Sequence, residues 1–111
     1  MIWRWLMALG DAPAIQCNID VENQKGSVSL RGRIVSARAT SGDYRLEIQS
    51  RSRSSSSNIS QAGQFKAEPQ APVFVGLANL SMEAGTRLVA RLTVQTADAR
   101  RCSSEREISD E

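Results

Sequence analysis

The sequence predicts an all-β domain, an immunoglobulin-like antiparallel β-sandwich of about seven strands. Short segments alternate apolar and polar residues, which is the pattern of strands with one buried face. Turn-forming residues separate these segments at intervals of roughly 8–12 residues. No segment shows a convincing helical period. These three observations favour the sandwich, and a small closed barrel is the alternative architecture.

The first half of the chain contains three alternating segments. They cover residues 15–21, 27–37 and 44–50. The side chains expected to point inward are Ile15, Cys17, Ile19 and Val21 in the first, Val28, Leu30 and Ile34 in the second, and Tyr44, Leu46 and Ile48 in the third. Residues 23–26 and 40–43 supply the turns between them. Gly32 falls on the inward side of its segment, where it admits a large neighbour or marks a bulge.

The second half supplies the remaining strands by the same reasoning. They cover residues 58–66, 73–80 and 87–97, and a short last strand carries Cys102. We expect the three aromatic residues that follow position 14 to lie in the core: Tyr44, Phe65 and Phe74. The serine-rich run 51–57 is typical of a hairpin tip, which could also serve as a contact loop.

The length of 111 residues fits one domain of ordinary size. We expect a signal-peptide remnant or N-terminal arm at 1–14, the sandwich at 15–104 and an acidic C-terminal tail at 105–111. The first part combines a short apolar run with an Ala-x-Ala pattern at Ala12 to Ala14. It is too short to span a membrane, so no membrane span is expected. The tail holds Glu105, Glu107, Asp110 and Glu111 against Arg106 alone.

Two cysteines, Cys17 and Cys102, lie near the ends of the proposed domain. Their separation argues against a Cys-x-x-Cys redox motif and against a metal knuckle. We therefore predict a disulfide between the first and last strands, and the alternative is two buried free thiols in a cytosolic protein. Disulfides persist outside the cytosol, so the predicted bond indicates the periplasm or the exterior.

The sequence contains no histidine. It therefore lacks the usual general base and the commonest metal ligand, and two cysteines are too few for a structural zinc site. We expect no enzymatic activity, no metal and no cofactor. The basic residues are twelve arginines with Lys25 and Lys66. They are not interleaved with exposed aromatic residues, so nucleic-acid binding is not expected either. Guanidinium groups suit polar or acidic partners, and a merely solvated surface is the alternative.

Three segments carry a family resemblance through their order and spacing. They are residues 41–48 (Ser-Gly-Asp-Tyr-Arg-Leu-Glu-Ile), residues 55–65 (Ser-Ser-Ser-Asn-Ile-Ser-Gln-Ala-Gly-Gln-Phe) and residues 90–94 (Ala-Arg-Leu-Thr-Val). With an early and a late cysteine, they resemble the CsgH family of curli-assembly inhibitors over roughly residues 15–102. The resemblance implies a periplasmic immunoglobulin-like chaperone that binds curlin subunits and inhibits premature amyloid assembly. In the functionally similar CsgC, a Cys-x-Cys pair corresponds to residues 42–44 of this chain, so no redox role carries over.

The predicted partner-binding face combines strand parity with this resemblance. The third and sixth strands of an immunoglobulin sandwich are neighbours, so their outward residues share a face. Those residues are Arg45, Glu47 and Gln49 on one strand and Arg91 and Thr93 on the other. Curlin subunits are implied to be rich in Gln and Asn, whose side chains accept hydrogen bonds from guanidinium. If this face is only solvated, the next candidates are Arg31 and Arg33 on the opposite sheet.

The sequence leaves a second function open. A generic extracytoplasmic binding or accessory module, such as an inhibitor or an adhesin-like domain, would share the same fold, and an exposed loop such as 51–57 would then bind the partner. In either case we expect a monomer.

Overall fold

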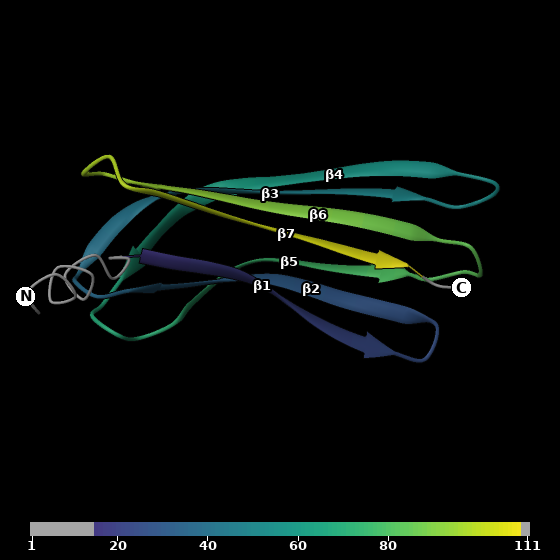
Figure 1. Cartoon of the computed structure of the whole chain (residues 1–111), viewed down its shortest axis with the longest axis horizontal. Coiled ribbons are helices and arrows are strands. Elements are labelled where there is room, and N and C mark those ends of the chain that lie inside the picture. The colour runs from purple at the N-terminus through teal and green to yellow at the C-terminus, as the bar shows by residue number, and fades with distance from the viewer. Residues whose placement is uncertain (1–14, 110–111) are drawn as a thin grey trace, which may run out of the picture.

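The computed structural model describes residues 15–109, which form seven strands and no helix. The strands are β1 (Ile15–Gln24), β2 (Ser27–Ser36), β3 (Thr40–Arg51), β4 (Ser56–Ala67), β5 (Val73–Ser81), β6 (Arg87–Thr96) and β7 (Arg101–Ser109) (Figure 1). The segment 1–14, predicted as a signal remnant or an arm, lies outside the described residues, as do positions 110 and 111.

Two antiparallel sheets pack face to face (Figure 1). One has the strand order β1-β2-β5, and the other has the order β4-β3-β6-β7. The third and sixth strands are neighbours, as the prediction requires, and their ladder runs from Gly42 opposite Thr96 to Arg51 opposite Arg87. The all-β sandwich prediction is therefore confirmed.

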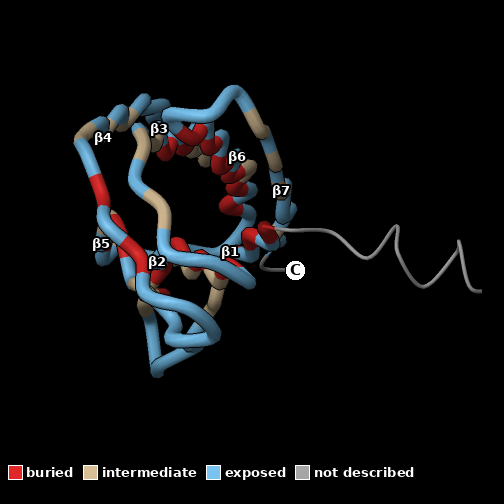
Figure 2. The backbone as a smooth tube through the Cα atoms, turned by 90° about the vertical axis from the view of Figure 1, so that its left-hand side faces the viewer, coloured by how far each residue is buried: buried red, intermediate tan, exposed pale blue. Residues whose placement is uncertain are grey.

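The core lies between the two sheets and is mainly aliphatic, and Phe65 is buried in it as predicted (Figure 2). Successive side chains of a strand point to opposite faces, so every second residue contributes to it. The largest fully buried apolar side chains are Ile19, Val28, Leu30, Ile34, Leu46, Ile48, Leu88, Leu92 and Val94. The predicted inward parity is confirmed in β1, β2, β3 and β6, although Val21 and Tyr44 are only half-buried.

Strand β5 departs from regular alternation at a bulge. Its register against β2 shifts at Gly76, which has a φ of 71°. The bulge turns both Val75 and Ala78 inward and leaves Phe74 and Leu77 exposed by 50% and 59%. The prediction that Phe74 lies in the core is therefore wrong. The segment is apolar on both faces, so alternation could not show which side chain points out, and the guanidinium of Arg31 lies 3.9 Å from the centre of the Phe74 ring.

Strand β7 is longer than predicted, and this corrects the acidic tail. Residues 105–109 continue the strand against β6 instead of leaving the sandwich at 104. The acidic residues belong to a strand because they alternate with inward positions, and Ile108 packs against the core. Glu105 and Glu107 lie on the outer face, where each is close to an arginine of β6.

Side chains close both lateral seams between the sheets. On one side the disulfide between Cys17 and Cys102 joins β1 to β7, with Cα atoms 6.0 Å apart, and Arg106 donates to the carbonyl of Ile19 at 3.1 Å. On the other side the Gln61 carboxamide of β4 bonds the backbone of Leu77 in β5. Its Nε2 donates to the Leu77 carbonyl, and the Leu77 N–H donates to its Oε1, both at 3.0 Å.

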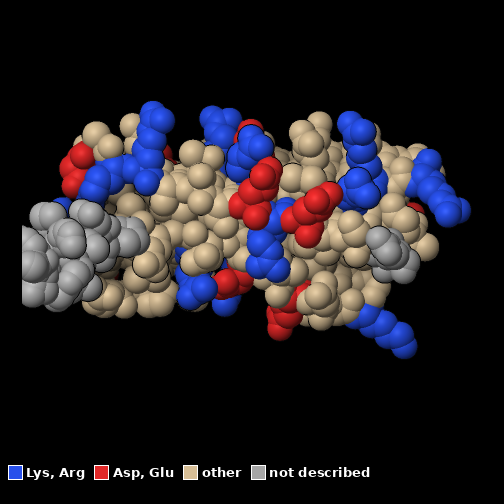
Figure 3. All heavy atoms as spheres, in the orientation of Figure 1, with Lys and Arg blue, Asp and Glu red and all other residues tan. Residues whose placement is uncertain are grey.

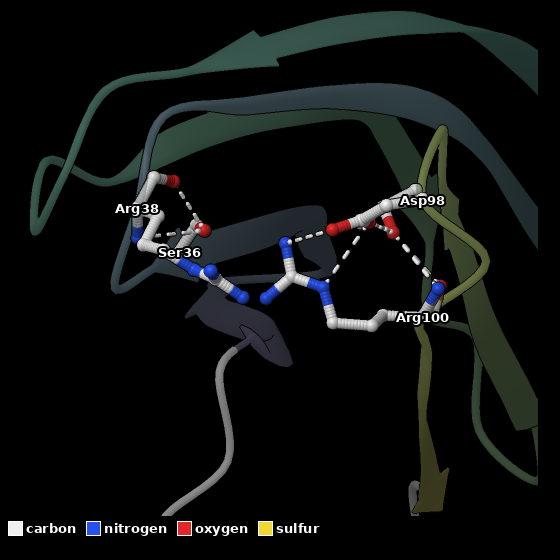
Figure 4. Close-up of polar contacts among 5 residues, drawn as sticks. Ser36, Arg38, Asp98 and Arg100 are labelled. Carbon is white, nitrogen blue, oxygen red and sulfur yellow. Dashed lines mark hydrogen bonds and ion pairs between the residues drawn. The ribbon is translucent and has the colours of Figure 1, made fainter.

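The turn between β6 and β7 is held by its own polar side chains (Figure 4). The Thr96 hydroxyl donates to the Asp98 carboxylate and accepts the Arg100 N–H at 2.9 Å. The Arg100 guanidinium reaches back to the same carboxylate, with 3.0 Å between Nη2 and Oδ2. These contacts lower the pKa of Asp98 below its ordinary value, the Thr96 hydrogen bond contributing most and the Arg100 hydrogen bond next.

Candidate partner-binding face

The structure brings the five predicted site residues onto the outer face of the four-stranded sheet. Residues directly opposite one another in antiparallel strands share a face. Arg45 of β3 lies opposite Thr93 of β6, and Glu47 lies opposite Arg91. Gln49 lies opposite Val89. We refer to Arg45, Glu47, Gln49, Arg91 and Thr93 as the arginine face, and all five are exposed.

Ion pairs neutralise the two arginines of this face to different degrees. Arg91 Nη2 lies 3.0 Å from Glu105 Oε2 of β7 and donates a hydrogen bond to it. Arg45 Nη1 lies 4.0 Å from Glu47 Oε2, at the outer limit of an ion pair. Arg45 therefore keeps more of its hydrogen-bonding capacity for a partner than Arg91 does.

Strand β7 adds residues to this surface that the sequence analysis did not place there. Glu105 pairs with Arg91, and Glu107 Oε2 lies 3.6 Å from Arg87 Nε. The predicted tail at 105–111 would have kept them off the sheet. The signal that could have found them is the even spacing of Cys102 and Ile108, which places both on one face of an extended strand.

Two hollows indent the outer face beside β4. The first, of about 310 Å³, is lined by side chains or backbone of Glu47, Ile48, Gln49, Asn58, Ile59, Ser60, Val89, Arg91 and Glu105. The second, of about 510 Å³, is lined by Asp43, Tyr44, Arg45, Ala62, Gly63, Gln64, Thr93 and Gln95. Both hollows thus extend from the arginine face to residues of β4.

Basic and acidic groups are interspersed over the surface, not separated into two regions. Figure 3 shows basic side chains along the upper edge, over the four-stranded sheet, with acidic side chains among them. On the outer face of the three-stranded sheet, the arginines are occupied by neighbouring side chains of the same sheet. There Arg31 and Arg33 both approach Asp20, with nitrogen–oxygen distances of 3.9 and 3.3 Å, and Arg31 also covers Phe74. Of the two candidate faces, that of the four-stranded sheet carries the arginine with the longer ion-pair contact, Arg45.

The arginine face carries groups that could bind a polar partner. It presents guanidinium donors, carboxylate acceptors and a carboxamide on a rigid ladder, and such groups make directional hydrogen bonds with amide side chains. Within residues 15–109, no three His, Cys, Asp or Glu side chains gather where they could hold a metal ion. The same span contains no helix that is long and apolar enough to cross a membrane.

Comparison with known proteins gives the family. The solution structure of R. palustris CsgH is similar to this chain with a TM-score of 0.69 and 30% identity, over 82% of this chain and 89% of that one. The E. coli curli protein CsgC has a TM-score of 0.71 at 11% identity, over 84% and 96% of the two chains. The sporulation control protein Spo0M of Bacillus subtilis has a TM-score of 0.58 at 10% identity, over 89% of this chain and 50% of that one.

The two likenesses of lowest identity show the fold alone. A search of curated proteins found no match. The model of the CsgH protein family matches residues 16–105, which is most of the described domain. This chain therefore belongs to the CsgH family.

Proposed function

We propose that this protein is a periplasmic chaperone that binds curlin subunits and delays their assembly into amyloid fibres. The observation that carries the proposal is the arginine face, a polar and partly neutralised surface on a domain of the CsgH family. The family supports a curli-associated role, and the structural likeness to a protein named as a curli protein agrees with it. The disulfide supports an oxidising compartment such as the periplasm.

The arginine face would bind the side chains that drive amyloid stacking. Glutamine and asparagine form ladders along a cross-β fibre, and each carboxamide oxygen so engaged is a hydrogen-bond acceptor. Arg45 has donors to spare because its contact with Glu47 is long. Contacts of this kind are individually weak, so the subunit is delayed without being trapped. The domain acts as a monomer in this proposal.

The test follows curlin fibril growth in the presence of the purified domain. We expect Arg45→Glu to lengthen the lag phase less than the wild type does, because the substitution removes the freer guanidinium and places a second carboxylate near Glu47. The matched control is Arg53→Glu, which makes the same change of charge in the loop between β3 and β4. Circular dichroism checks that both variants keep the β-sheet spectrum.

The outcomes separate the alternatives. Weakened inhibition by Arg45→Glu with full inhibition by Arg53→Glu supports the arginine face. Equal weakening by both would mean that only net charge matters. If the wild-type domain does not delay fibril growth at all, the chaperone proposal is wrong and a generic binding module becomes the better reading.

A further inference from the structure

The four sheet edges of the sandwich are not equally protected. The facing edges of β1 and β7 are joined by the disulfide and by the Arg106 bond to Ile19. The edge of β5 carries the Gly76 bulge, and its Leu77 backbone is bonded to Gln61. Bulges and covered backbone groups are the usual devices that stop an edge strand from pairing with another chain.

Strand β4 lacks these devices. It is 12 residues long and pairs with β3 over its whole length without a register shift. It contains no proline, and its one charged residue is Lys66, next to its end. Among the described strands, β4 is the last in its sheet and has no partner beyond β3.

The backbone groups on the open edge of β4 can be identified. The Ser52 N–H donates to the Ser55 carbonyl at 2.8 Å, so this pair closes the β3–β4 hairpin with direct hydrogen bonding. Hydrogen-bonded and non-bonded pairs alternate along an antiparallel ladder. Counted from the bonded Ser52–Ser55 pair, the pair of Ile48 and Ile59 is also bonded, so the backbone groups of Ile59 point towards β3. The N–H and C=O groups of Asn58, Ser60 and Ala62 therefore point away from β3, towards the open edge.

The side chains beside this edge are uncharged from Ser56 to Gln64. The residues that share the outer face on β4 over this stretch are Ser56, Asn58, Ser60, Ala62 and Gln64, and Lys66 follows them near the end of the strand. A strand added here would set its own outward side chains next to hydroxyl and carboxamide groups, which suit Ser, Asn and Gln better than charged residues. The hollow that Asn58 and Ser60 share with Glu47 and Arg91 makes this edge continuous with the arginine face.

We infer that the open edge of β4 binds an extended segment rich in Gln, Asn and Ser as an added antiparallel or parallel strand. Main-chain hydrogen bonds would hold the segment, and its outward side chains would reach the arginine face. The inference rests on the proposed function for the identity of its natural partner, a curlin subunit. The pairing itself depends only on the edge and on the chemistry of the segment.

The test measures amide hydrogen exchange by NMR. The probe is a synthetic peptide of about twelve residues built only from Ser, Gln, Asn, Gly and Ala, so that it can pair with the whole of β4. We expect saturating peptide to slow exchange of the Asn58, Ser60 and Ala62 amides by about tenfold or more. The Ile59 and Gln61 amides, already bonded to β3, should change little. Unchanged exchange at the three edge amides would overturn the inference.

A pair of variants tests peptide binding at this edge independently. Ser60→Pro removes an edge N–H without removing a bond to β3, and proline is tolerated on edge strands at such positions. Ser60→Ala keeps the N–H and removes only the hydroxyl. We expect the proline variant to bind the peptide at least about tenfold more weakly, and the alanine variant to bind like the wild type. If the proline variant does not fold, the exchange measurement on the wild type decides.

Failure of this inference can be told apart from failure of the proposed function. If the wild type and Ser60→Pro delay curlin fibrils equally, the edge is not used and the chaperone proposal stands. If the wild type has no effect on fibrils, the chaperone proposal falls, and the peptide exchange still decides the edge. Protection that appears without peptide, rises with protein concentration and accompanies a doubled mass in sedimentation would show a second copy on the edge and overturn the inference.

Discussion

Removing the Cys17–Cys102 bond should take away a large part of the stability of the domain. The bond closes a loop with a sequence separation of 85 residues. In the chain-entropy model, a loop of this length restrains the unfolded chain by about 4.5 kcal/mol, against a total stability of roughly 5–15 kcal/mol for an ordinary domain. The described strands β1 and β7 form no ladder with each other, so the disulfide joins two strands that share no ladder hydrogen bonds, and the Arg106 bond to Ile19 crosses the same seam. We expect Cys17→Ala with Cys102→Ala to lower the free energy of unfolding by about 2–5 kcal/mol.

Urea unfolding followed by circular dichroism measures this loss. The corresponding fall in melting temperature is about 10–30 °C for a domain of this size. Dithiothreitol added to the wild type should give the same midpoint as the double variant. Ser103→Ala, on the outer face next to Cys102, is the matched control and should change the free energy by less than about 0.5 kcal/mol. A double variant within about 1 kcal/mol of the wild type would refute the argument that the bond restrains the unfolded chain.

Two further predictions concern polar side chains that close the structure. Gln61→Ala removes both hydrogen bonds to Leu77 and should lower the free energy of unfolding, measured in urea, by about 1–2 kcal/mol. The control Gln64→Ala, on the outer face of β4, should change this free energy by less than about 0.5 kcal/mol. Equal effects of the two variants would mean that the hydrogen bonds between Gln61 and Leu77 contribute nothing to stability. The lowered pKa of Asp98 means that its ionised form stabilises the fold above the ordinary value of 3.8, and that this contribution is lost as the pH falls through the lower folded-state pKa. The stability difference between wild type and Asp98→Asn should therefore be present near neutral pH and shrink in acid, and a pH-independent difference would contradict this assignment.

Strand parity was predictable because it depends on a local pattern. Residues such as Leu46, Ile48 and Leu92 alternate with polar neighbours, and a one-residue shift would expose the whole apolar set. The same parity placed Arg45 and Arg91 on the outer face. The neighbouring position of β3 and β6 followed from the sandwich architecture, not from any residue, and the register confirms it.

The features that were not predicted depend on contacts distant in sequence. Phe74 lies in an apolar run with no preferred face, and its exposure is set by the bulge that β5 makes against β2. Gln61 is an inward polar residue whose role appears only when the Leu77 backbone lies beside it, 16 positions away in the chain. The sequence predicts Glu105 in a charged tail because its partner Arg91 lies 14 positions earlier on another strand.

A protein that pairs with amyloid-forming strands must avoid extending the same assembly. A cross-β fibre needs dry, closely packed interfaces between its sheets. The outer face of the four-stranded sheet cannot form one, because Arg91 of β6 and Glu105 of β7 form an ion pair that is more than half exposed, and drying it would remove the hydration of both charges. A segment added to β4 would thus lie at the margin of a sheet that cannot stack. The open edge and the arginine face would then act together, since the edge supplies main-chain partners and the charges stop the growth of a second layer.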